Sequence, residues 1–138
     1  MLDKNGKELK TGQIVKIEGS FFKTDNGTYI VKKSPGNPSW CGKDYSLVKC
    51  NRKGEESTAK HNICFWPLGV FVNSREKSIE ARKHNKENAT IEIIGEVRTY
   101  NVKITQRMGW NDYEYEDILT EKSYNEALQN KFLTLALI

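Results

Sequence analysis

The stretch that decides the fold is Gly12-Gln-Ile-Val-Lys-Ile17, followed by the turn Asp25-Asn26-Gly27 and then by Thr28-Tyr-Ile-Val31. The two flanking runs are rich in β-branched residues, which favour extended backbone. Asn-Gly is a strong signal for chain reversal, because both residues tolerate a positive φ. The pattern therefore predicts two short antiparallel strands that pair with each other.

Short β-rich runs continue along the first half of the chain. Residues 45–50 predict a third strand, residues 51–54 its turn, and residues 61–66 a fourth strand that is stopped by Pro67. Residues 68–72 can extend the same sheet. We expect at least three antiparallel strands between residues 12 and 66, wound as a small barrel or a curled sheet.

A polar helix is predicted next. Asn73 and Glu76 form a capping box, and the helix is expected to continue to about Lys86. Only Ile79 and Ala81 are apolar within it, so we expect the helix to lie on the surface with one narrow contact to the core.

The last third predicts a hairpin and a second helix. Residues 91–94 and 97–104 look like the two strands of a hairpin. A second capping box, residues 123–126, precedes apolar residues at helical spacing, which predicts a C-terminal helix docked on the sheet. The alternative for its apolar end is contact with another subunit. The residues at helical spacing are Tyr124, Leu128, Phe132 and Leu135, and those of the apolar end are Leu133, Leu135, Leu137 and Ile138.

The opening of the chain resembles a KOW-type SH3-like small barrel. The resemblance rests on residues 12–17, on Gly19, Phe21 and Phe22, and on Asn26-Gly27 before Tyr29. It covers residues 9–31, and it extends to residue 72 if the third and fourth strands complete the barrel. It implies an SH3-like barrel over about residues 8–72.

The expected architecture is a single domain over residues 1–138, mainly β and of the α+β class. The barrel-like part, residues 8–72, is followed in residues 73–138 by a surface helix, a hairpin and a C-terminal helix packed on it. An α+β sheet with two helices is the rival architecture.

Composition limits the class of protein. The chain has 138 residues, 37% hydrophobic and 29% charged, which fits one globular domain. Its apolar runs are far shorter than the roughly 20 residues of a membrane span. No apolar segment follows the charged N-terminal residues, and the three cysteines are odd in number with no CxxC. We therefore expect a cytoplasmic protein with no signal peptide and no membrane partner.

Cys41, Cys50, His61 and Cys64 have the residue types of a zinc site, in the order C-x8-C-x10-H-x2-C. This spacing lacks the close ligand pairs of a zinc knuckle, and the competing interpretation is that the cysteines are core residues. The sequence does not say whether the four converge. We expect free thiols and no metal.

No catalytic signature is found. Cys41 with His61 or His84 would offer a thiol and a base, but no family motif surrounds Cys41. Glycine-rich phosphate loops are missing from the sequence. We expect no enzymatic activity, no catalytic residues and no cofactor.

An acidic and aromatic stretch lies between residues 110 and 121. It suits a divalent cation, a mimic of nucleic-acid phosphates, or a basic partner, while the competing interpretation is a set of solvated acids in a loop. Its spacing is not that of an EF-hand. The residues are Asp112, Glu114, Glu116, Asp117 and Glu121, with Trp110, Tyr113 and Tyr115 interleaved.

Charge is distributed unevenly. Residues 1–90 carry 17 Lys and Arg against 10 Asp and Glu, a net +7, whereas residues 91–138 carry 5 against 8, a net −3. A basic surface attracts polyanions, and loop aromatics can stack on bases. We therefore expect a non-catalytic protein that binds nucleic acid or a ribonucleoprotein. The candidate contact residues are Phe21, Phe22, Trp40, Arg75, Lys77, Arg82, Lys83 and Lys86.

The alternative function is a protein-binding modulator. Residues 37–42 and 62–67 give the chain a texture that resembles uncharacterised small proteins of bacterial phages and mobile elements. This resemblance implies, as one possibility, a phage-encoded inhibitor of a host defence complex. Its contact surface would be the Trp40 loop or the acidic stretch. Oligomerisation through the C-terminal helix is a further expectation.

Overall fold

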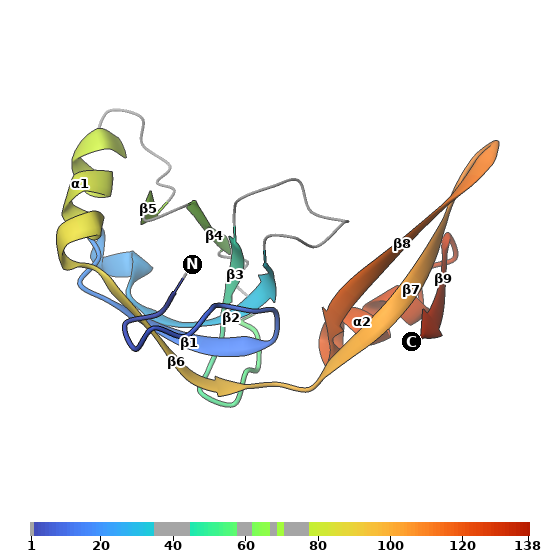
Figure 1. Cartoon of the computed structure of the whole chain (residues 1–138), viewed down its shortest axis with the longest axis horizontal. Helices are drawn as coiled ribbons and strands as arrows, with labels where there is room; N and C mark the ends of the chain where they lie inside the picture. Colours follow the sequence, from blue (N-terminus) through green and yellow to red (C-terminus); the bar gives the residue numbers. More distant parts are fainter. Residues whose placement is uncertain (1, 35–44, 58–61, 67–68, 71–77) are drawn as a thin grey trace.

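The computed structural model describes residues 2–34, 45–57, 62–66, 69–70 and 78–138. The chain forms two antiparallel β-sheets, each accompanied by one α-helix, and a short connection joins them (Figure 1). The expected mainly β class with two helices is confirmed. In the described part of the chain, no helix is long and apolar enough to span a membrane.

The first sheet has six strands in the order β5-β4-β3-β2-β1-β6, and all its pairings are antiparallel. The first five strands follow one another as a meander, which confirms the strands predicted before Pro67. The turn after β3 is closed by the backbone of Asn51, whose N–H donates to the carbonyl of Glu55. The strands are β1 (Gln13–Glu18), β2 (Gly27–Lys33), β3 (Tyr45–Lys49), β4 (Asn62–Trp66), β5 (Gly69–Val70) and β6 (Thr90–Glu96).

The SH3-like barrel expected over residues 8–72 is not formed by the described residues, because neither sheet closes on itself. In the first sheet, β5 and β6 are the two edges and do not pair with each other. A 3-10 turn, η1 (Lys23–Asp25), precedes β2 where the chain reverses.

The prediction of a hairpin between residues 91–94 and 97–104 is wrong. The strand β6 pairs along its length with β1, from Gln13 opposite Glu96 to Glu18 opposite Thr90. Its Ile91 is buried, and Ile93 packs against the core of the first sheet. Pairing with β1, which lies far earlier in the sequence, places Ile91 and Ile93 in the core of the first sheet. This burial explains why β6 pairs with β1 and not with the next strand of the chain.

The main core of the first sheet lies on one face, because side chains alternate along each strand, while Ile14 and Ile30 are buried on the other face. Val15, Tyr29 and Leu47 are among its fully buried members. The helix α1 (Ser78–Asn88) contributes Ala81 to the same cluster, while Ile79 is exposed. The expected narrow contact of a polar surface helix is therefore confirmed. The helix ends two residues beyond the predicted Lys86, and its predicted capping box lies outside the described residues.

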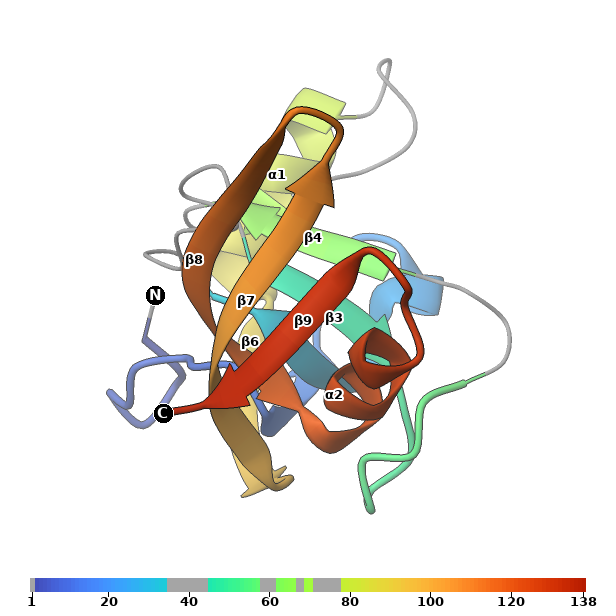
Figure 2. The same cartoon turned by 90° about the vertical axis from the view of Figure 1, so that its right-hand side faces the viewer.

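The second sheet has three strands in the order β8-β7-β9, and β7 lies between its two neighbours (Figure 2). The strands are β7 (Thr99–Met108), β8 (Asn111–Thr120) and β9 (Leu133–Leu137). The acidic stretch is thus a strand, and the interpretation of its acids as loop residues is wrong. The alternation of the acids with Tyr113 and Tyr115 has the period of two that a strand requires.

The C-terminal helix is shorter than predicted. The helix α2 (Glu121–Leu128) is capped by Thr120, whose side chain accepts a hydrogen bond from the Ser123 backbone. After it the chain turns and continues as β9 instead of as helix. Leu133, Leu135 and Leu137 also match the period of two that a strand requires, and in the structure these residues form a strand. The helix and β9 cover one small cluster centred on Val102, Ile104 and Leu119.

Candidate functional site

A long hairpin of β7 and β8 projects from the body of the protein (Figure 1). The two strands pair over ten residues, from Thr99 opposite Thr120 to Met108 opposite Asn111. The third strand, β9, pairs only with residues 102–106 of β7. The last part of the hairpin therefore extends beyond the sheet, and none of the described strands lies beside it.

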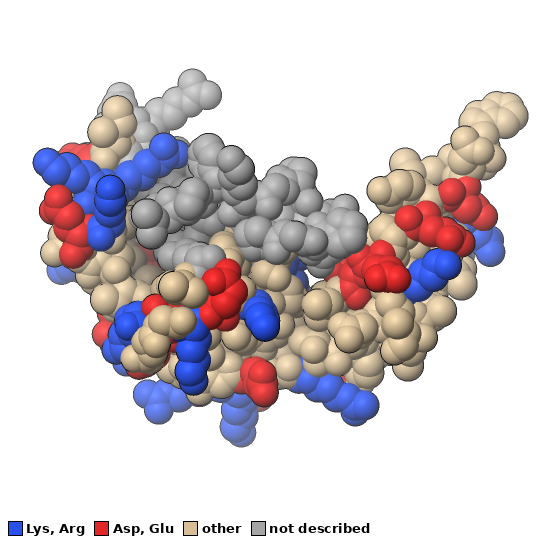
Figure 3. Space-filling view, in the orientation of Figure 1, with Lys and Arg blue, Asp and Glu red and all other residues tan. Residues whose placement is uncertain are grey.

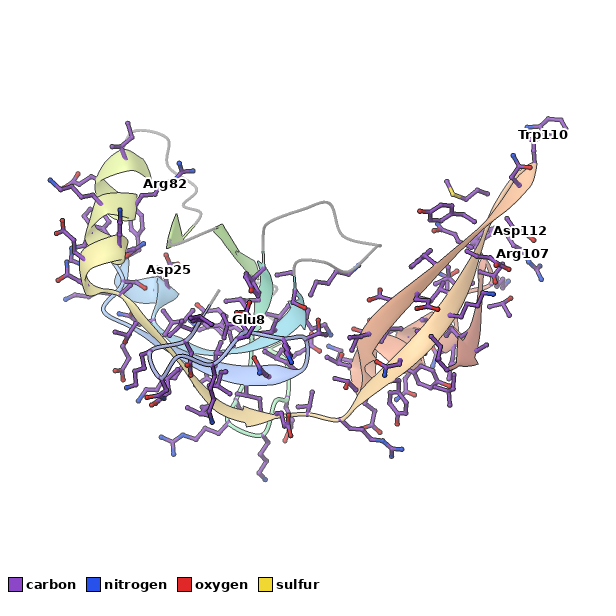
Figure 4. The ribbon with its side chains drawn as sticks, viewed as in Figure 1. Glu8, Asp25, Arg82, Arg107, Trp110 and Asp112 are labelled. Carbon is purple, nitrogen blue, oxygen red and sulfur yellow. The ribbon has the colours of Figure 1, made fainter. Side chains whose placement is uncertain are left out.

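The hairpin turn consists of Gly109 and Trp110. Gly109 has a φ of +69°, and the first position of a two-residue hairpin turn needs a positive φ, which glycine adopts without strain. This geometry makes the turn tight and places Trp110 at its outermost point. Figure 4 shows the indole pointing away from the molecule.

The apolar side chains at this tip are exposed to solvent. Trp110 is 100% exposed, Met108 is 60% exposed and Tyr113 is 53% exposed. An exposed tryptophan leaves the largest apolar side chain in water, a state that association with a partner would relieve. The tip is therefore a candidate anchor for another molecule.

Acidic side chains line the hairpin below the tip. Asp112, Glu114 and Glu116 are exposed and alternate along β8. Glu114 pairs with Lys103 across the strands at 3.3 Å, with both side chains more than half exposed. Figure 3 shows acidic atoms along the hairpin, while Lys and Arg are most abundant over the first sheet and α1.

A cluster of charged residues holds the two sheets together. Lys32 is the extra residue of a β-bulge in β2, and bulges redirect side chains. Its Nζ lies 2.7 Å from Glu56 Oε2 and 3.2 Å from the hydroxyl of Thr120. Lys122 of α2 lies 3.7 Å from the other oxygen of Glu56. We call Lys32, Glu56, Thr120 and Lys122 the junction cluster.

The connection between the sheets is also pinned by two glycines. The Val97 N–H donates to the Gly12 carbonyl at 2.7 Å. A Cβ on Gly54 would come within 2.4 Å of Val97, and one on Gly12 within 2.4 Å of Thr99. Both glycines also have positive φ. Only glycine permits this approach, so the connection is held closely against the first sheet.

An open groove of about 700 Å³ lies at this junction. Its walls include Ile30 and Val97, together with the acidic residues Glu55, Glu56 and Glu126. Among the residues that the structure describes, no cluster of His, Cys, Asp or Glu is arranged to hold a metal ion. The groove carries no recognisable catalytic set.

The structure describes only part of the predicted basic face of the helix. Arg82, Lys83 and Lys86 are exposed on α1 and make no ion pair among the described residues. Arg82 and Lys86 are one turn apart and so share a face. Figure 4 shows Arg82 and Trp110 at opposite ends of the molecule. Arg75, Lys77 and Trp40 lie outside the described residues.

The predicted stacking aromatics Phe21 and Phe22 are half-buried against the first core. Their rings meet edge to face at 5.0 Å, and Phe21 also lies 5.6 Å from the ring of His84. The backbone N–H of Phe21 donates to Asn85 of α1 at 2.8 Å. In this structure the two rings secure α1 to the sheet.

Of the proposed zinc ligands, only the Cys50 side chain is described; Cys41 and His61 lie outside the described residues, as does the side chain of Cys64. Cys50 is a free thiol. Burial, and secondarily the charge of Glu56, raises the pKa of Cys50 to about 11. A thiol with such a pKa stays protonated at neutral pH and is a poor nucleophile or metal ligand.

Sequence reasoning missed the projecting hairpin. The signal was present, because Gly109-Trp110 separates two runs that alternate with a period of two. Trp110 was noted within the acidic stretch, but not as the end of a turn. No protein-family model, curated protein or solved structure matches this chain.

Proposed function

We propose that this protein is a non-catalytic binding protein that contacts another protein through the hairpin of β7 and β8. The observation that carries the proposal is Trp110, fully exposed at the end of an arm that extends past the residues of β7 paired with β9. Tryptophan is among the residues most enriched at the energetic centres of protein interfaces, where it fills a pocket on the partner.

Charge narrows the kind of partner. Asp112, Glu114 and Glu116 lie along β8 below the tip. They outnumber the facing cations of β7, Lys103 and Arg107, so a partner with Lys or Arg at the rim of an apolar pocket would be complementary. The same acids would repel the phosphates of a nucleic acid at this end of the molecule. The expectation that such a partner belongs to a host defence complex stays a prediction.

The junction cluster supports this use of the hairpin. A binding element that is already held in place loses less conformational entropy on association than a mobile one. The hydrogen bond from Lys32 to Thr120, the ion pair of Lys122 with Glu56 and the close contact of Val97 with Gly54 fix the base of the arm to the first sheet. The first sheet then acts as a support for the second.

The test is affinity capture from the native host, comparing the parent with Trp110→Ala and Ile79→Ala. Ile79 is a matched control, because it is 82% exposed but lies on α1. We expect a specific protein to be recovered by the parent and by Ile79→Ala. Trp110→Ala should bind the purified partner roughly 30-fold more weakly, the usual effect of losing a central tryptophan. Equal affinity for Trp110→Ala would refute the proposal.

Nucleic-acid binding through α1 is the second candidate, supported by the exposure of Arg82, Lys83 and Lys86. Affinity for single- and double-stranded nucleic acid should then fall with salt, as counterion release requires. Replacing the three by Gln should flatten that dependence by somewhat under one unit per lost phosphate contact. Trp110→Ala should leave it unchanged. An unchanged salt dependence in the triple variant would exclude this helix as the contact.

A further inference from the structure

The two edges of the second sheet differ in chemistry. The strand β8 carries an acid at every second position from Asp112 to Glu116. The strand β9 reads Leu-Thr-Leu-Ala-Leu, with no charge, proline or glycine. Charged side chains are a common way to keep an edge strand from pairing with another chain. Thus β8 has this protection and β9 lacks it.

Hydrogen bonds show which backbone groups of β9 point outward. The Arg107 N–H donates to the Phe132 carbonyl, and the Ile138 N–H donates to the Asn101 carbonyl. Because hydrogen-bonded pairs alternate in an antiparallel ladder, Thr134 and Ala136 bond to β7 as well. The backbone groups of residues 133, 135 and 137 therefore face away from β7.

This outer edge is largely open. The Leu133 N–H donates to the Asn130 carbonyl. The N–H groups of Leu135 and Leu137 have no acceptor in the described part of the chain. The helix α2 packs Tyr124 and Ala127 against the apolar cluster on one face of the sheet. Leu137 is 61% exposed.

We propose that β9 is a dimerisation edge that pairs antiparallel with β9 of a second copy of this chain. The outward residues define a self-complementary register, with Leu135 opposite Leu135 and Leu133 opposite Leu137 of the second copy. The N–H groups of Leu135 and Leu137 from both chains would then donate four hydrogen bonds across the interface.

A second copy fits this edge for two reasons. A two-fold axis through Leu135 brings leucine opposite leucine on one face and Thr134 opposite Ala136 on the other, with no like charges in contact. The same operation at β8 would oppose rows of acids. The resulting sheet would have the order β8-β7-β9-β9-β7-β8, and its two Trp110 tips would project from opposite ends. This inference is independent of what the tips bind.

Amide hydrogen exchange on the parent protein tests the register without any mutation. Raising the concentration from micromolar to millimolar should slow exchange at Leu135 and Leu137. The amides of Thr134 and Ala136 serve as internal controls, because they are bonded to β7 at every concentration. Exchange at Leu135 and Leu137 that is independent of concentration would overturn the proposal.

Variants test the edge by mass in solution. Leu137→Lys places a charge opposite Leu133 of the second copy and should weaken the dimer roughly tenfold or more. Ile118→Lys, which changes an exposed apolar residue on the β8 side, should dimerise like the parent. Leu137→Pro removes one outward donor but no bond to β7, and it should also weaken the dimer. A monomeric parent at millimolar concentration, or a dimer that resists both changes at Leu137, would show that β9 does not pair.

Discussion

The two sheets of this protein differ in where their apolar side chains lie. In the first sheet, residues such as Val15, Tyr29 and Leu47 are fully buried in a core to which α1 contributes Ala81. In the second, three residues form the buried centre, and several large apolar side chains remain exposed. Those with more than half of their surface exposed are Met108, Trp110, Tyr113, Leu128, Phe132, Leu137 and Ile138.

This difference separates stability from recognition. Burial of apolar surface is the main favourable term in folding, so most of the stability should come from the first sheet. Exposed apolar surface contributes little to folding but becomes available to a partner. Substitutions in the two sheets should therefore differ in their effects on stability.

Leu47→Ala should destabilise the protein by about 3 kcal/mol, because a fully buried leucine leaves both lost transfer energy and a cavity. Denaturant unfolding measures the change through the midpoint and slope. A loss below about 1 kcal/mol would mean that the first core repacks easily and is not the main source of stability.

Glu56→Gln should destabilise by about 2 kcal/mol, because it leaves the largely buried Lys32 ammonium without its counter-charge. The change should also loosen the second sheet relative to the first, seen as faster amide exchange in β7 and β8. Glu114→Gln is the matched control. Its pair with Lys103 is exposed, so its effect should stay within about 0.5 kcal/mol. Equal effects of the two changes would contradict a structural role for the junction cluster.

Asp3→Asn should remove stability that depends on pH. Burial raises the pKa of Asp3, but hydrogen bonds from the backbone of Ile93, Lys7 and Asn5 outweigh it and lower the net pKa. The carboxylate therefore stabilises the fold above its unfolded pKa of about 4, and this contribution is lost as pH falls through the lowered folded value. The thermal midpoints of parent and variant should differ most at neutral pH, and the difference should become smaller in acid. A difference that is constant with pH would exclude the charge as its cause.

Trp110→Ala should have the smallest effect on stability, within about 0.5 kcal/mol, because the side chain is fully exposed and touches no core. Thermal unfolding of the purified variant provides the measurement. A marked loss of stability would show that the indole packs on the protein in solution and is not free for a partner.

Local signals in the sequence were sufficient for the meander of the first sheet. Its strands, and a turn such as that at Asn26-Gly27, can be recognised within a few residues. The pairing of β6 with β1 could not be read in this way. It depends on Ile91 and Ile93 completing a core made by residues far earlier in the chain. Pairing between distant segments leaves no mark in local periodicity, so the nearest run was wrongly chosen as partner.

The sequence predicted the residue types of the candidate site but not their arrangement in space. The exposure of Arg82, Lys83 and Lys86 follows from the polarity of their helix, as expected. The acids and aromatics of residues 110–121 were recognised, but an alternating stretch between turn residues was interpreted as a loop. The junction cluster had no sequence signal, because a β-bulge at Lys32 and a contact with Glu56 arise only when the sheets are assembled.

The position of β1 between β2 and β6 also bears on the order in which the chain folds. Its pairing with β2 closes a short loop, whereas its pairing with β6 must wait for α1 and carries a larger loop-closure entropy. The strands β7, β8 and β9 with α2 are all close in sequence, so the smaller sheet can form early. The first sheet, although it holds the larger core, is then completed late, when β6 arrives and the Val97 N–H meets Gly12. The most stable part of this protein is therefore expected to be the last to reach its final topology.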